Sequence, residues 1–196
     1  MTFEIIIFFS VIIQLIGVSF YIRDMLRGTT KPNLVTWSIW ALAPLIGSWL
    51  EWKAGARLSI FPVFMAGFNP LLVIAVAFVI KKGYWKIKKF DVFCGALAIF
   101  ALILWLITKN ISISVLFAIL SDALASLPTL AKSWTNPETE TFTAYLGGII
   151  ANILGLVVIK NWIFPVYSLG VYFILMNTLI IAFIFRKKVL YFRNEK

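Results

Sequence analysis

Long apolar runs separated by short polar stretches make up most of this chain of 196 residues. Each run is close to the roughly 20 residues that a helix needs to cross a hydrocarbon core of about 30 Å. The polar stretches are too short to fold as a water-soluble domain. The pattern predicts an all-α integral membrane protein with seven transmembrane helices, at 3–21, 33–50, 58–80, 91–108, 111–132, 141–159 and 163–185.

The composition supports this interpretation. Apolar residues account for 62% of the chain and charged residues for 13%, against about 45–50% and about 25% in soluble domains. The first run has no basic stretch before it and no small-residue cleavage site, so we interpret it as an uncleaved span. With the N-terminus outside, 14 of the 18 Lys and Arg residues lie in cytoplasmic loops. The positive-inside rule therefore places the C-terminus in the cytoplasm, most naturally at a bacterial inner (plasma) membrane.

Several classes of function are disfavoured. The net charge of +10 is explained by the loop charges that orient the protein, so we expect no nucleic-acid partner. The basic run 81–89 is expected to face anionic lipid headgroups. The chain has no histidine and one cysteine, Cys94, which disfavours zinc sites, His-based catalysis and an internal disulfide. We therefore expect no enzyme activity, no cofactor and no metal.

Two halves of the chain share a polar pattern. The stretches GFNPLLVIAVAF at 67–78 and LMNTLIIAFIF at 175–185 each place one asparagine, Asn69 or Asn177, within an apolar run. Upstream, the Thr-x-Pro turn at 30–32 matches the one at 135–137, and Trp40 aligns with Tyr145. Duplicated helices with matched polar residues at mid-membrane are typical of transporters.

The repeat predicts the domain layout. Two parallel triplets, 1–80 and 111–196, require one extra span between them, because three is an odd number. The segment 81–110 supplies that span after a basic loop, and its helix carries no polar group stronger than Cys94 at mid-span. We expect it to be a linker, which gives two three-helix repeats joined by one helix (3+1+3).

The segment 127–156, LPTLAKSWTNPETETFTAYLGGIIANILGL, resembles the PQ-loop repeat. It has a proline near a helix end, a basic loop, a Ser/Thr-acid stretch and a glycine-rich helix. With the 3+1+3 layout, the whole chain resembles the PQ-loop and SWEET-like superfamily of small transporters, as a divergent, bacterial-type member. The proline is followed by Thr129 rather than glutamine, and the first repeat has Ile22-Arg23-Asp24 instead of the dipeptide.

This resemblance implies alternating access of two triple-helix bundles around a central cavity. It further implies that Asn69 and Asn177 line the substrate site, and Trp40 and Tyr145 are the candidates for their aromatic partners. Proline hinges of the kind such carriers use are present in part, as Pro44 and Pro128. The segments 3–21 and 141–159 contain no proline.

Other polar residues lie within the apolar runs. Gln14 and Asn152 are candidates either for lining the cavity or for hydrogen bonds between helices. Asp122 is expected to be the only acid inside a span, and a carboxyl group there could carry a proton across a transport cycle. The alternative is a neutral, hydrogen-bonded structural role. The charged stretch Lys132–Glu140 is expected to be a solvated loop.

The favoured function is a membrane transporter that moves a small polar solute, a sugar or an amino acid, by alternating access. Whether transport is coupled to protons is left open. The pair Trp37-x-x-Trp40 also resembles aromatic motifs of nicotinamide riboside carriers, which makes a vitamin carrier the first alternative. A non-transporting SWEET-like receptor or assembly subunit is the second. The expected partners are the lipid bilayer and the solute, and a homo-oligomer remains open.

Overall fold

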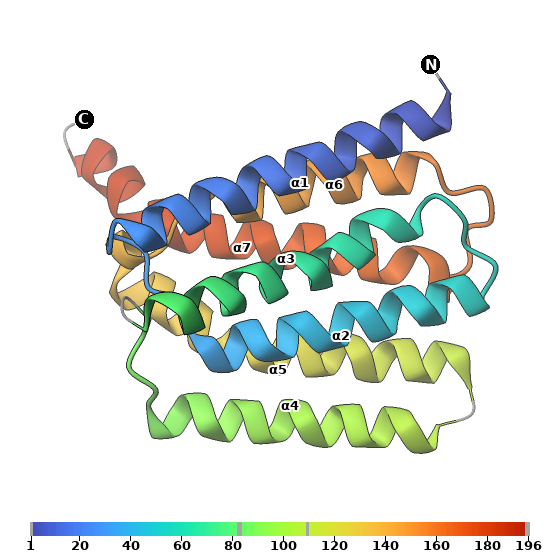
Figure 1. Ribbon diagram of the computed structural model, residues 1–196, viewed down its shortest axis with the longest axis horizontal. Coiled ribbons are helices and arrows are strands. Elements are labelled where there is room, and N and C mark those ends of the chain that lie inside the picture. Colours follow the sequence, from blue (N-terminus) through green and yellow to red (C-terminus); the bar gives the residue numbers. More distant parts are fainter. Residues whose placement is uncertain (1, 82–83, 109, 195–196) are drawn as a thin grey trace.

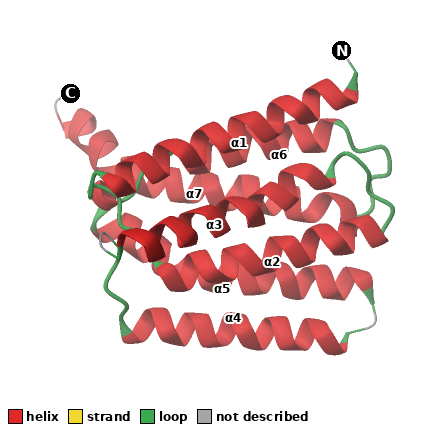
Figure 2. Ribbon diagram, viewed as in Figure 1, coloured by secondary structure: helices red, strands yellow, loops and turns green. Residues whose placement is uncertain are grey.

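The computed structural model describes residues 2–81, 84–108 and 110–194. Within these ranges the chain forms α-helices, one short 3-10 helix and no β-strand (Figure 2). The prediction of an all-helical protein is confirmed, and each predicted segment coincides with one helix. The helices are α1 (Phe3–Leu26), α2 (Leu34–Lys53), α3 (Ile60–Ile80), α4 (Lys89–Ile107), α5 (Ile111–Thr135), the 3-10 helix η1 (Pro137–Thr139), α6 (Thr143–Val157) and α7 (Phe164–Asn194).

The helices lie side by side along the long axis of the molecule, and successive α-helices run in opposite directions (Figure 1). The two chain termini therefore lie at opposite ends of the bundle. We call the end at which α7 finishes the C-terminal end; it carries the connections 27–33 and 136–142 and the residues 84–88 before α4. The opposite end, where α1 begins, is called the N-terminal end.

The helix contacts follow a paired pattern. α3 packs against both α1 and α2, and α7 packs against both α5 and α6. Between these groups, α1 packs against α6, and α2 packs against α5. α4 packs on α5 and more lightly on α2, and it lies at the edge of the bundle (Figure 1). The core of the molecule is thus enclosed by six helices, with α4 outside them.

Within the described part of the chain, four helices are long and apolar enough to cross a membrane, judged by length and composition: Phe3–Leu26, Ile60–Ile80, Ile111–Thr135 and Phe164–Arg186. α6 is apolar but shorter. Large apolar side chains are also exposed on the outer surface of the bundle, among them Phe8, Phe78, Phe93 and Leu175. Exposed apolar surface of this extent is typical of proteins that face lipid.

Glycine permits the close approach of α1 and α6. A Cβ atom at Gly17 would lie 2.6 Å from the backbone oxygen of Thr143, and one at Gly147 would lie 3.0 Å from the backbone oxygen of Ile13. The Thr143 hydroxyl donates a hydrogen bond of 3.1 Å to the Gly17 carbonyl. This is the small-residue packing that membrane helices use to bring backbones together.

Replacing Gly17 by alanine is expected to destabilise the protein by about 1–3 kcal/mol, because the new methyl group meets backbone atoms that cannot rotate away. The measurement is thermal unfolding of the purified protein in detergent. The matched control is Gly47→Ala, whose methyl group meets the flexible Leu169 side chain instead. Equal losses for the two variants would contradict the argument from close backbone approach.

Candidate functional site

A central cavity lies between the six enclosing helices. The space open to the centres of water-sized spheres in it is about 70 Å3. This is room for roughly five water molecules, at about 10–15 Å3 each. Every enclosing helix contributes to its walls, and α4 does not. The lining residues are Gln14, Val18, Trp37, Trp40, Ala66, Asn69, Pro70, Asp122, Ala144, Tyr145, Gly148, Asn152, Phe173, Met176 and Asn177.

All six residues predicted to bind solute or protons line this one cavity. They come from five different helices, and they are Trp40, Asn69, Asp122, Tyr145, Asn152 and Asn177. Gln14 is there as well, but its amide donates a hydrogen bond of 3.0 Å to the Pro62 carbonyl and so joins α1 to α3. Gln14 therefore has a structural hydrogen bond, which several of the other polar residues lack.

The matched asparagines have free amides. Neither Asn69 nor Asn177 forms a side-chain hydrogen bond with a described residue, and the Oδ1 atom of Asn69 is buried. A Cβ atom at Gly148 would lie 2.8 Å from the Asn177 amide nitrogen, so this glycine makes room for the amide. An unpaired buried amide is unfavourable unless water or a ligand bonds to it.

Proline adds a further polar group beside Asn69. Pro70 lies inside α3 and lines the cavity together with Ala66. Because proline has no N–H, the Ala66 carbonyl loses the donor that it would have in a regular helix. The sequence analysis gave Pro70 no role, although its position directly after Asn69 was a usable signal.

Asp122 is buried and held in place by α7. One carboxyl oxygen, Oδ2, accepts a hydrogen bond of 2.7 Å from the Tyr172 hydroxyl. The other, Oδ1, is buried with no hydrogen-bond partner among the described residues. On the next turn, the Ser126 hydroxyl donates 2.8 Å to the Asp122 carbonyl and accepts 3.1 Å from the Trp40 indole nitrogen. Asp122 therefore keeps one oxygen available for a proton or a ligand.

Four aromatic rings separate the cavity from the C-terminal end. We call Tyr21, Trp37, Trp40 and Tyr145 the aromatic cluster. Its ring centroids form a closed circuit of contacts, at 4.7, 5.5, 6.2 and 6.4 Å, and all four side chains are buried. Edge-to-face contacts at these distances are favourable. The predicted aromatic residues Trp40 and Tyr145 thus contact each other, and Tyr21, which the sequence analysis missed, completes the circuit.

A buried ion pair lies beyond the aromatic cluster. The Lys132 ammonium lies 2.5 Å from Glu140 Oε1, and both side chains are almost completely buried, at 1% and 0% exposure. The Tyr145 hydroxyl donates 2.9 Å to Glu140 Oε2, which connects the pair to the aromatic cluster. Lys132 also donates to the Lys31 carbonyl. The expectation of a solvated loop at Lys132–Glu140 is therefore wrong: α5 continues to Thr135, and the fold buries both charges.

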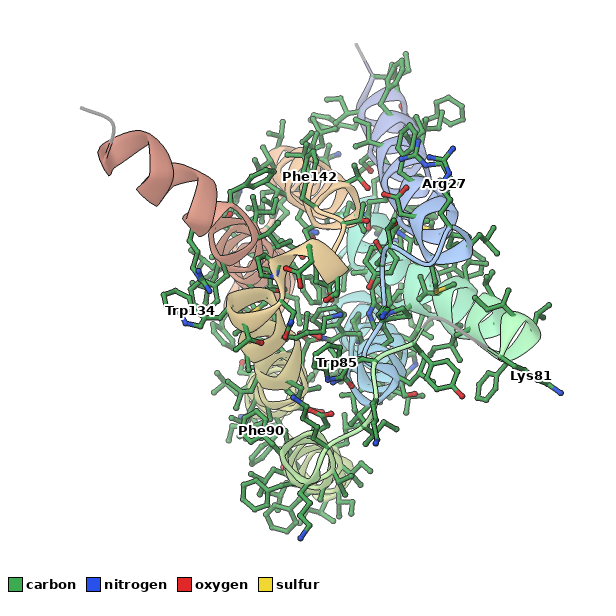
Figure 3. All side chains as sticks on the ribbon, turned by 90° about the vertical axis from the view of Figure 1, so that its left-hand side faces the viewer. Arg27, Lys81, Trp85, Phe90, Trp134 and Phe142 are labelled. Carbon is green, nitrogen blue, oxygen red and sulfur yellow. The ribbon has the colours of Figure 1, made fainter. Side chains whose placement is uncertain are left out.

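Further hydrogen bonds connect the two halves at the same end. The Lys31 amide donates 3.0 Å to the Thr139 carbonyl, and the Thr141 hydroxyl donates 2.9 Å to Asp24. Trp85 lies near the middle of the C-terminal end in Figure 3, whereas Arg27, Lys81 and Trp134 lie toward its rim. Its amide donates 3.0 Å to Pro32, and the Lys132 ammonium lies 5.6 Å from its ring centroid. The C-terminal end is therefore closed.

The two candidate hinge residues lie within helices. Pro44 is inside α2 and Pro128 is inside α5, and both are buried. These helices pack against each other across the two halves, with Thr36 donating 2.7 Å to the Ala125 carbonyl. Each proline removes one backbone hydrogen bond from its helix. They therefore occur where the two halves meet.

The N-terminal end is more open. A hollow of about 260 Å3 lies there between the start of α1, the α2–α3 connection and the α6–α7 connection, and its charged lining residues are Glu4, Arg57 and Lys160. Close to this hollow, Glu51 is fully buried in the last turn of α2. The sequence analysis considered only Asp122 as a buried acid, and the fold buries Glu51 as well, because α2 continues to Lys53.

Comparison with protein-family models, with curated proteins and with solved structures finds no match to this chain. The site is therefore interpreted from its own geometry. That geometry is a small cavity at the centre of an apolar bundle, closed toward one end, in which a few polar groups interrupt a mainly apolar lining. It contains amide and carboxyl oxygens that have no hydrogen-bond partner among the described residues. Such a cavity is suited to binding a small polar molecule.

Proposed function

We propose that this chain is a membrane transporter that moves a small polar solute, of the sugar or amino acid class, by alternating access. The observation that carries the proposal is that two amides without a hydrogen bond to a described residue, Asn69 on α3 and Asn177 on α7, line one cavity. An amide offers both a donor and an acceptor, which suits a polyhydroxylated or zwitterionic solute. Had the asparagines served only to join helices, as Gln14 does, they would be expected to bond to a neighbouring helix.

The packing pattern supports a duplicated architecture. α3 lies between α1 and α2 as α7 lies between α5 and α6, and the α1–α6 contact has its counterpart in the α5–α2 contact. This is the pattern expected of two three-helix repeats with α4 as a linker, in which the solute site lies between the repeats. On this basis we also propose that the chain belongs with the PQ-loop and SWEET-like transporters.

Two further features support alternating access. The C-terminal end is closed by the aromatic cluster and by the Lys132–Glu140 pair, whereas the N-terminal end has a hollow of about 260 Å3. A carrier alternates between such closures on its two sides. We propose that all seven α-helices cross a bacterial inner membrane, with the C-terminal end in the cytoplasm. Of the 14 basic residues counted for the cytoplasmic side, Lys132 belongs to the buried pair. The other thirteen support this orientation by the positive-inside rule.

A heteroaromatic solute such as nicotinamide riboside is the second candidate. Trp37 and Trp40 both line the cavity, and an aromatic wall favours a ring-shaped ligand. The two indole rings already contact each other edge to face, with centroids 5.5 Å apart. A stacked ligand would therefore have to use the ring surfaces that face the cavity, which makes the amide-based proposal the stronger one.

A thermal-shift screen tests the proposal. Purified protein in detergent is heated with monosaccharides, disaccharides, amino acids and nucleosides, including nicotinamide riboside. A solute at about 100 times its dissociation constant is expected to add about 2.7 kcal/mol of stability. In the double variant Asn69→Ala/Asn177→Ala, loss of the amide hydrogen bonds is expected to weaken binding by about 2–3 kcal/mol, roughly 30- to 150-fold in affinity.

The matched control is Thr178→Ala, next to Asn177 in α7. Thr178 is exposed, and its hydroxyl donates 2.7 Å to the Ile174 carbonyl of its own helix. This variant should keep the solute-induced shift. If no solute stabilises the well-folded wild type, the receptor or assembly-subunit alternative replaces the transporter. If the double variant fails to fold, the amides have a structural role instead.

A further inference from the structure

Glu51 is a buried acid that does not line the central cavity. Its side chain is 0% exposed, and neither carboxyl oxygen has a hydrogen bond or an ion pair among the described residues. A carboxylate in this state would be very unfavourable, because burial removes its hydration and nothing replaces it. Glu51 must therefore be neutralised by a species that the side chains around it do not provide.

The space beside Glu51 is limited. It lines a small cavity of about 10 Å3, which is room for about one water molecule. The other polar side chains of this small cavity are Ser59 and Asn152, and Asn152 has a buried Oδ1 atom without a partner. A solute-sized ligand does not fit there, whereas a water molecule or a single small ion does.

The small cavity lies between the two larger ones. Asn152 lines both the small cavity and the central cavity. Ser59 and Val166 line both the small cavity and the hollow at the N-terminal end. The order is therefore the hollow, then Ser59, then Glu51, then Asn152, then the central cavity. Ser59, Glu51 and Asn152 are the polar side chains along this order, and the other residues that line the small cavity carry no polar side chain.

The charged groups nearby do not neutralise Glu51. Its small cavity is lined by α2, α3, α6, α7 and the residues next to them, and none of its other lining residues is titratable. Glu4 from α1, Arg57 from the α2–α3 connection and Lys160 from the α6–α7 connection line the hollow instead. On α2 itself, the Lys53 ammonium lies over the rings of Trp49 and Trp52, at 5.4 and 5.5 Å.

We propose that Glu51 is a proton-binding site at which a proton enters from the hollow on its way to the central cavity. This inference rests on the proposed function, since it supplies the step by which a proton would reach the solute site. A hydronium ion in the hollow gives its proton to the Glu51 carboxylate, and an O–H bond forms on that oxygen. The carboxyl group then releases the proton to a water molecule in the small cavity, and Asn152 orients that water.

A proton is favoured over a metal cation by the donors present. Sodium needs several oxygen ligands at once, and the side chains of the small cavity offer the Glu51 carboxyl, one amide and one hydroxyl. A proton needs only one oxygen. Both species would neutralise the carboxylate, so the experiment has to separate them.

Infrared difference spectroscopy tests the proposal directly. The probe is the carbonyl band of a protonated carboxylic acid, recorded in lipid nanodiscs from about pH 5 to about pH 9. In Asp122→Asn protein, which removes the acid of the central cavity, we expect a band that shrinks about tenfold per pH unit above its midpoint. The double variant Glu51→Gln/Asp122→Asn should lack this band. Glu51→Asp in the Asp122→Asn background should keep a pH-dependent band, because it keeps the acid.

Three outcomes would overturn the inference. The first is a Glu51 band of constant height over the whole pH range, which would mean a permanently protonated structural group. The second is the absence of any band that depends on Glu51. The third is a band that sodium chloride removes at constant pH while choline chloride does not, which would assign the site to a metal cation. The solute screen is independent, so a pH-dependent band without solute binding would retain this site and reject the transporter.

Discussion

Lys132→Ala is expected to destabilise the protein by about 3–5 kcal/mol, because it leaves the carboxylate of Glu140 buried without its counter-charge. Both members of the pair are almost completely buried, at 1% and 0% exposure. The Tyr145 hydroxyl donates one hydrogen bond to Glu140, but it is neutral and does not replace the positive charge. The measurement is the free energy of unfolding in detergent, from thermal or denaturant melts.

Two variants separate charge from packing in this experiment. Lys132→Met combined with Glu140→Gln removes both charges and keeps similar volumes, so stability should return close to that of the wild type. Arg23→Ala breaks an exposed pair, in which the arginine side chain is 47% exposed, and should cost no more than about 1 kcal/mol. If the neutral double variant is as unstable as Lys132→Ala, packing rather than charge holds this end of the bundle together.

Asp122→Asn is expected to abolish uptake driven by a pH gradient while solute exchange continues. The asparagine amide oxygen can still accept the hydrogen bond from Tyr172, which is 2.7 Å in the native protein. The amide cannot bind and release a proton, so the coupling is lost without a change in the shape of the cavity. The measurement is uptake of the identified solute into proteoliposomes, with and without an imposed pH gradient.

Tyr172→Phe is the control for this variant. It removes the donor to Oδ2 and leaves the carboxyl group of Asp122 in place, so uptake should still respond to the gradient. Exchange without a gradient reports whether each variant still binds and moves the solute. If Asp122→Asn protein responds to the gradient as the wild type does, Asp122 is not the coupling group.

The helices were predictable because hydrophobic run length is a local property. Segment 58–80 coincides with α3 (Ile60–Ile80), and segment 111–132 begins where α5 does. Asn69 and Asn177 were predictable for a similar reason, since each is a single amide within a long apolar run. That these two residues line one cavity was expected from the repeat, which relates positions far apart in the chain, whereas Asp122 and Asn152 were singled out only as polar residues within apolar runs.

Buried charges were not predictable in this way. Lys132 and Glu140 occur in a stretch rich in polar residues, which resembles a loop in composition. Their burial depends on α5 continuing past the apolar run and on the connection 27–33 covering them. Glu51 was missed because it lies between two tryptophans at the edge of an apolar segment, where an acid normally contacts water. Only the packing of α6 and α7 around it excludes the solvent.

The aromatic cluster also depends on the three-dimensional fold. Tyr21, Trp37 and Tyr145 come from α1, α2 and α6, and no spacing in the chain relates the first of them to the others. Trp37 and Trp40 were recognised as a pair because they are three residues apart on one helix face. Their joint contact with two tyrosines arises only when α1 packs against α6.

The aromatic cluster also affects how this protein would behave in an energised membrane. Moving one elementary charge through a potential of 100 mV is worth about 2.3 kcal/mol. A continuous file of water through the bundle would therefore let ions cross and dissipate the membrane potential. Four contacting rings leave a hydrated ion no wet path, because it would have to shed its water to pass between them. The side chains that form a wall of the cavity would therefore also block the leakage of ions. Water and solute could then enter the cavity from one side while the membrane potential is maintained.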